Sequence, residues 1–330
     1  MHFGRRTFTV VFLALLVVTP LTVPARQHAR VARVGLLESS SPSAFPDRVE
    51  ALRRGLSELG YREGHTLSFE YRWAHGKIAD LPRLAAELVR VKVDVIVAGT
   101  TPAALAARDA TSLIPIVFAV PADPVGVGLV SGFPRPGGNV TGLTTANVEI
   151  VPKRLELLKE LSGERVSRGA VLFNPADASN VLMVRATQDA AKRLGLSLRS
   201  FPVKRAEDFE AAFSTMATDR IDALLVAAGA LTDSHAGTLA DLAARIRVPA
   251  MYGARGFVEA GGLVSYSASF SDNYRRAAAY VDKILRGAAP GDLPVEQASK
   301  FELAINLRTA KALGLSIPPS FLLRADVVIE

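Results

Sequence analysis

The chain alternates short apolar runs with amphipathic helical segments, and this alternation constrains its fold more than any other feature. Apolar runs rich in Val, Ile, Leu and Ala occur at 31–37, 93–98, 114–120, 169–174 and 222–228. Segments with apolar residues at helical spacing lie between such runs, for example at 46–59 and 81–89. Continuous apolar runs of this length fit strands that are covered on both faces, as in a parallel sheet with flanking helices. The alternation therefore predicts an α/β fold built from βα units.

These βα units come in two successive sets. A stretch rich in Pro and Gly, at 134–142, separates them. A length of 330 residues exceeds what a single hydrophobic core usually covers. We therefore predict two doubly wound parallel-sheet lobes that are built alike.

Three further elements remain after both sets are complete, so we expect the chain to thread back between the lobes and form a multi-strand hinge. The expected hinge segments lie near Gly142, 265–267 and 292–297. The expected domain boundaries place residues 31–142 with 268–292 in the first lobe, and residues 143–267 with 293–330 in the second.

The first 25 residues have the features of a secretory signal peptide. Arg5 and Arg6 precede an apolar stretch at 8–18, and the small residue Ala25 suits a cleavage site. The apolar stretch is shorter than the about 20 residues of a membrane-spanning helix, although a retained anchor is the alternative. The chain has no cysteine, which excludes a lipoprotein anchor. We predict a periplasmic protein whose residues 1–25 are removed on export, with both general and twin-arginine export left open.

The charge pattern and the motifs of the chain do not indicate nucleic-acid binding, zinc binding, dinucleotide binding or hydrolase activity. The formal net charge is +7, but basic and acidic residues alternate, as at 53–65, so no basic stripe predicts a nucleic-acid partner. The five histidines are scattered, without the spacing of a zinc site. The glycines of GVGLVSG, at 126–132, depart from the dinucleotide-binding spacing, and no GxSxG motif occurs. We therefore predict no catalytic residue, no metal and no cofactor, although an exported enzyme remains an alternative.

Small and polar residues follow the carboxyl ends of several predicted strands. In open parallel sheets, ligands bind at these ends, where the N-termini of helices present free N–H groups. Ser and Thr at such positions are equally explained as helix N-caps. The recurrence of these residues at many strand ends favours a cleft that holds a small molecule between the lobes. The candidate ligand-binding residues are Glu38, Ser39, Ser40, Gly99, Thr100, Thr101, Val120, Asp123, Asn174, Ala228, Gly229, Tyr252 and Tyr266.

Several long phrases closely resemble the TrpX-like substrate-binding proteins of ABC transporters. They include EYRWA at 70–74, DPVGVGLVSGFPRPGGNVTG at 123–142 and LPVEQASKFELAINLRTAKALGLSIPPSFLLRADVVIE at 293–330. The resemblance implies a type I periplasmic-binding-protein fold, with a small organic solute captured between the lobes by hinge closure. It also implies an ABC permease and its ATPase as partners, and we expect a monomer in solution. A ligand sensor for a membrane signalling protein would share these features and stays open.

Two positions depart from what the resemblance implies about the ligand. The best-known relatives bind aromatic amino acids, with an aromatic residue after the first strand and an acid after the strand that matches DALLVAA. This chain has Ser39 and Gly229 at these places. Asp123 and the Thr100–Thr101 pair match the family. We therefore expect a small organic solute that is either amino-acid-like or a carboxylate, and these two positions favour an acid without an α-amino group.

Overall fold

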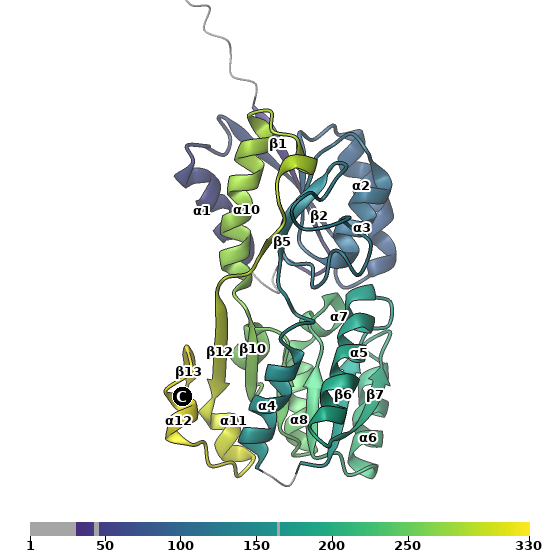
Figure 1. Cartoon of the computed structure of the whole chain (residues 1–330), viewed down its shortest axis with the longest axis vertical. Helices are drawn as coiled ribbons and strands as arrows, with labels where there is room; N and C mark the ends of the chain where they lie inside the picture. The colour runs from purple at the N-terminus through teal and green to yellow at the C-terminus, as the bar shows by residue number, and fades with distance from the viewer. Residues whose placement is uncertain (1–30, 43–45, 164–165) are drawn as a thin grey trace, which may run out of the picture. The chain divides into compact units, whose positions relative to one another are not determined.

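The structure of the protein is a computed structural model that describes residues 31–42, 46–163 and 166–330. The predicted signal peptide, residues 1–25, lies outside the described residues. Val31–Glu330 form one compact unit, which contains two sheets with helices on both faces of each (Figure 1). The prediction of an α/β fold with two doubly wound parallel-sheet lobes is confirmed.

The first sheet has six strands in the order β11-β5-β4-β3-β1-β2, and all of its paired strands are parallel. Their bounds are Glu296–Gln297 for β11, Val140–Thr144 for β5, Ile116–Phe118 for β4, Val95–Ala98 for β3, Ala32–Glu38 for β1 and Leu67–Trp73 for β2. From β2 to β5 the order is 2-1-3-4-5, a doubly wound order whose switch point lies between β1 and β3.

Two helices cover each face of the first sheet. One face packs against α1 (Pro46–Glu58) and α10 (Phe270–Leu285), and the other against α2 (Leu81–Arg90) and α3 (Thr101–Ala110). Although α10 follows α1 by more than 200 residues, the two helices lie side by side (Figure 1). The first lobe, here meaning the first sheet with these four helices, is thus completed by a late segment of the chain.

The second sheet has seven strands in the order β13-β12-β10-β9-β8-β6-β7. Only the β10–β12 pair is antiparallel among its described pairings. Their bounds are Val327–Ile329 for β13, Phe301–Asn306 for β12, Val264–Ala268 for β10, Ala250–Tyr252 for β9, Ala223–Val226 for β8, Arg168–Phe173 for β6 and Ser197–Pro202 for β7. The order from β7 to β10 repeats the 2-1-3-4-5 order of the first sheet.

Helices again cover both faces of the second sheet, and together with it they form the second lobe. One face packs against α4 (Val151–Ser162), α5 (Ala178–Arg193), α11 (Leu307–Ala312) and α12 (Pro319–Leu322). The other face packs against α6 (Asp208–Thr218), α7 (Ala230–Asp233), α8 (Ala236–Arg245) and α9 (Arg255–Glu259). Within the described residues, no helix is both long enough and apolar enough to span a membrane.

Three connections cross from one sheet to the other: from β5 to α4, from β10 to α10 and from β11 to β12. Sheet pairing differs from the expected boundaries at two of them. Strand β5 keeps Leu143 and Thr144 in the first sheet, and β11 keeps Glu296 and Gln297 there, although both pairs were expected in the second lobe. The stretch rich in Pro and Gly at 134–142 had placed the first boundary between the lobes at Gly142.

Strand β5 contains Gly142, although glycine is unusual within strands. Its φ is +146°, and a side chain at this position would collide with the backbone of Phe118 on β4. Only glycine adopts such a conformation without strain and lets the two backbones approach this closely. The glycine therefore marks close strand packing, and all five residues of β5 are buried.

Candidate functional site

A cavity of about 40 Å³ lies between the two sheets, beyond the carboxyl ends of their strands. We call it the inner cavity. The first lobe contributes Arg48, Thr100, Thr101, Val120, Ala122 and Phe270 to its wall. The second lobe and the crossing before α4 contribute Asn147, Asp177, Ser179, Asn180, Met183, Ala228, Gly229 and Asp233. Five of the predicted site residues line this cavity: Thr100, Thr101, Val120, Ala228 and Gly229.

Two threonine hydroxyls lie on the first-lobe side, where β3 ends and α3 begins. Thr100 is the N-cap of α3, because its Oγ1 accepts a hydrogen bond from the Ala103 N–H over 3.3 Å. Its hydroxyl also contacts that of Ser39. Thr101 Oγ1 accepts from the Ala122 N–H over 3.4 Å. Both explanations considered for Thr100 therefore apply at once, since it caps a helix and also faces the cavity.

Two buried carboxyl groups lie on the second-lobe side. Asp177 is the N-cap of α5, and its Oδ1 accepts hydrogen bonds from the Ser179 N–H over 3.0 Å and hydroxyl over 2.6 Å. Asp233 ends the short helix α7, and its Oδ1 accepts from the Gly229 N–H over 3.2 Å. Burial raises the pKa of Asp177 and raises that of Asp233 to about 6, although Arg48 acts to lower the latter. The cavity thus holds two acids in a poorly solvated setting.

Arg48 supplies the positive charge of the inner cavity. It lies in the first turn of α1, is only 5% exposed, and places its Nη2 atom 3.9 Å from Asp233 Oδ2. Its Cζ atom lies 4.5 Å from the centre of the Phe270 ring. A guanidinium group in this place can hold a carboxylate by charge-assisted hydrogen bonds. Opposite charges therefore approach the same cavity from the two lobes.

The expectation of a ligand without an α-amino group rested on Gly229, which stands where relatives were expected to have an acid. In the structure, Asp233 lies one helical turn later and reaches back to the Gly229 amide, and Asp177 reaches the same cavity from the end of β6. The sequence signal that was missed is an acid a few residues beyond each of these strand ends.

Four predicted site residues at the end of β1 and β3 lie beside the inner cavity and do not line it. Glu38 is 2% exposed and its Oε1 atom accepts a hydrogen bond from the Tyr274 hydroxyl. Ser39 and Ser40 are also buried. Gly99 packs so closely here that a side chain would collide with the Glu38 carboxyl group and the Tyr274 hydroxyl. These residues form the layer that supports Thr100.

The other four predicted site residues have structural contacts away from the inner cavity. Asp123 Oδ1 accepts from the Gly126 N–H over 2.8 Å, and Asn174 Oδ1 accepts from the Ala176 N–H over 3.0 Å, so both stabilise turns. Tyr252 is buried in the core against Phe257. Tyr266 stacks on Phe301, with ring centres 6.0 Å apart. Asp123 and Asn174 follow strands, and Tyr252 and Tyr266 lie within β9 and β10. These positions predicted proximity to the cleft but not the direction of the side chains.

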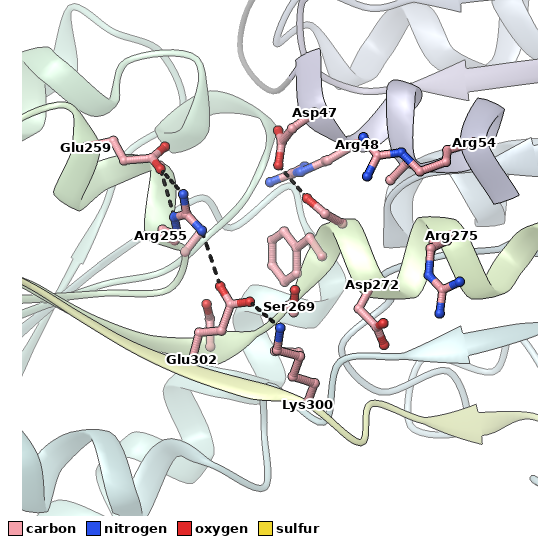
Figure 2. Close-up of a pocket in the computed structure, with 17 residues that line it drawn as sticks. Asp47, Arg48, Arg54, Arg255, Glu259, Ser269, Asp272, Arg275, Lys300 and Glu302 are labelled. Carbon is pink, nitrogen blue, oxygen red and sulfur yellow. Dashed lines mark hydrogen bonds and ion pairs between the residues drawn. The ribbon is translucent and has the colours of Figure 1, made fainter. Parts of the chain in front are cut away.

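A second cavity, of about 320 Å³, also lies between residues of both lobes (Figure 2). We call it the outer cavity. Figure 2 shows Arg255 between the carboxylates of Glu259 and Glu302, and Lys300 beside Glu302. Arg48 and Phe270 line both cavities, so they form the partition between them.

The described part of the chain holds no cluster of three or more His, Cys, Asp or Glu residues that could bind a metal ion. What the inner cavity offers instead is a set of hydrogen-bonding and charged groups: two threonine hydroxyls, one guanidinium and two carboxyls. Such a set can bind and orient a small polar molecule.

Comparisons with known proteins agree with this arrangement. The family model described as ABC transporter substrate binding protein matches residues 34–329. The tyrosine-binding protein of Clostridioides difficile (strain R20291) is 29% identical over 262 residues, which are 79% of this chain and 75% of that protein.

Two solved structures are similar over nearly the whole chain. A conserved domain protein from Vibrio cholerae is 31% identical with a TM-score of 0.85, over 91% of this chain and all of that one. The ABC domain in complex with L-Trp from Streptococcus pneumonia is 28% identical with a TM-score of 0.85, over 90% of this chain and 99% of that one. The fold is therefore that of the type I periplasmic binding proteins, as expected.

Proposed function

Because the chain belongs to the family of ABC transporter substrate-binding proteins, we propose that it binds an α-amino acid in the inner cavity. The observation that carries this proposal is the placement of Arg48 and Asp233, two buried and oppositely charged groups, at one cavity. An amino acid zwitterion has complementary charges. Its carboxylate would bind Arg48 and the hydroxyls of Thr100 and Thr101, and its ammonium group would bind Asp233, with Asp177 nearby.

The ligand would contact both lobes and thereby favour the closed arrangement of the hinge. Residues from both lobes line the inner cavity, which supports this step. The protein would then deliver its ligand to an ABC permease and its ATPase on the outer side of the membrane, after export by the predicted signal peptide. The tyrosine-binding relative and the relative in complex with L-Trp support an amino acid as the ligand class.

Titration calorimetry on the purified protein tests the proposal. The ligands are the standard amino acids and, for each one that binds, two matched analogues: the acid without the α-amino group and the amide without the carboxylate. We expect both analogues to bind at least about tenfold more weakly, because each lacks one of the two charges through which the ligand would contact the cavity. Equal binding of an amino acid and its des-amino analogue would instead support the carboxylate ligand expected from the sequence. Failure of every amino acid to bind would reject the proposal.

A further inference from the structure

The partition between the two cavities consists of two side chains from neighbouring helices. Phe270 is the first residue of α10, and Arg48 lies on α1 with its Cζ atom 4.5 Å above the Phe270 ring. A stack of an arginine on an aromatic ring gains cation–π attraction, which is stronger where water is excluded. The 3.9 Å approach to Asp233 holds the same guanidinium from the other lobe.

The backbone around Phe270 is fixed from several directions. The Ser269 N–H donates to the Lys300 carbonyl over 2.9 Å, and the Asn273 N–H donates to the Ser269 carbonyl over 3.1 Å. The Asn273 side chain donates to the Ala119 carbonyl over 3.0 Å. These bonds tie the start of α10 to the β11–β12 crossing and to the end of β4. The backbone that carries Phe270 is therefore held on both sides of this residue, and Arg48 packs on its ring.

The inner cavity is small for the ligands of the aromatic-binding relatives. Its volume of about 40 Å³ is about an eighth of the volume of the outer cavity. Glycine, alanine and serine make the smallest demand on this space, whereas an indole or phenol side chain needs room beyond it. The outer cavity, of about 320 Å³, has the size of an ordinary ligand pocket, but Phe270 and Arg48 separate it from the inner one.

We propose that Phe270, held in place by Arg48, is a size-determining residue that restricts the binding site to small amino acids. The proposal rests on the proposed function. The ring occupies the path along which a larger side chain would extend from the inner into the outer cavity. Removing the ring joins the two cavities and gives a large side chain a place to lie.

The test is calorimetry of the wild-type protein and F270A with alanine, serine, tyrosine and tryptophan. We expect the wild type to bind alanine or serine at least tenfold more tightly than tyrosine or tryptophan. We expect F270A to bind tyrosine or tryptophan at least tenfold more tightly than the wild type does. F301A is the matched control, because Phe301 is a half-buried ring that lines neither cavity, and it should keep the wild-type preference.

The outcomes separate this proposal from the proposed function. Wild-type protein that binds tryptophan or tyrosine as tightly as alanine overturns the size limit and leaves amino acid binding intact. F270A that stays folded by thermal unfolding, yet gains no affinity for the aromatic amino acids, overturns the role of Phe270. Should F270A unfold, F270V is used instead, because valine also removes the ring but fills more of the space than alanine does. Absence of binding by any amino acid overturns both proposals.

Discussion

Arg48 Nη2 lies 3.9 Å from Asp233 Oδ2, and the two residues belong to helices that pack on different sheets. Both side chains are 6% exposed, so the pair joins the lobes in a largely dry setting. Attraction in such a place is offset by the cost of removing both charges from water. Under the proposed function, a zwitterion that enters between them would interact with each charge separately and take over the role of the pair.

The first prediction concerns Asp233. Replacing it by Asn keeps the shape of the side chain and removes the charge that would face a ligand ammonium group. D233N should bind its amino acid with an affinity lower by about 2 kcal/mol or more, roughly a thirtyfold higher Kd, measured by calorimetry.

D241N is the matched control for this variant, because Asp241 is an exposed acid on α8. Its Kd should equal that of the wild type. If D233N and D241N bind equally well, Asp233 does not hold the ligand.

The second prediction is a pH dependence of binding. Burial raises the pKa of Asp233 to about 6, so the carboxyl group is charged above this pH and neutral below it. Since only the charged form attracts an ammonium group, affinity should fall as the pH is lowered through about 6, by about tenfold between pH 7.5 and pH 5. The same titration on D233N should be nearly flat over this range. A wild-type Kd that does not change with pH would contradict the assignment.

Much of the fold was predictable because buried strands have a local signal. The runs that became β3 and β8 are continuous and apolar, and all of their residues are buried from both faces. Strand β5 was not predicted, because the stretch rich in Pro and Gly at 134–142 overlaps its first residues. Its burial depends on the close approach of Gly142 to β4, which is a property of the assembled sheet and not of the local sequence.

The lining of the inner cavity was predictable only where its residues closely follow strands. Thr100 and Gly229 satisfy this rule and line the inner cavity. Arg48 and Phe270 lie within the first turns of helices, and no local feature distinguishes Arg48 from Arg53 on the same helix. Their roles depend on how α1 and α10 pack together, and these helices are far apart in the sequence.

The third prediction separates the two roles of the threonines. T100A/T101A removes both hydroxyls and should weaken ligand binding by about 1–3 kcal/mol. It should also lower the free energy of unfolding by about 1 kcal/mol, because Thr100 caps α3. T100S/T101S keeps the hydroxyls and should resemble the wild type in both measurements. Reduced stability with unchanged affinity would limit Thr100 to its capping role.

The last prediction concerns Glu38, a buried acid that lines neither cavity. Burial raises its pKa from 4.5 to about 7, against the opposing effects of the Tyr274 hydrogen bond and the Arg48 charge, while the Asp233 charge raises it further. Because the folded protein holds this proton more tightly than the unfolded chain, the free energy of unfolding should decrease as the pH rises from about 4.5 to about 7.

Gln at position 38 can still accept the hydrogen bond from the Tyr274 hydroxyl, and it carries no charge. E38Q should therefore be more stable than the wild type by about 3 kcal/mol at pH 8, and the difference should become small near pH 4.5. Urea unfolding across this pH range measures it, with E207Q as an exposed control. If the difference in the free energy of unfolding between E38Q and the wild type is the same at every pH, folding does not raise the pKa of Glu38.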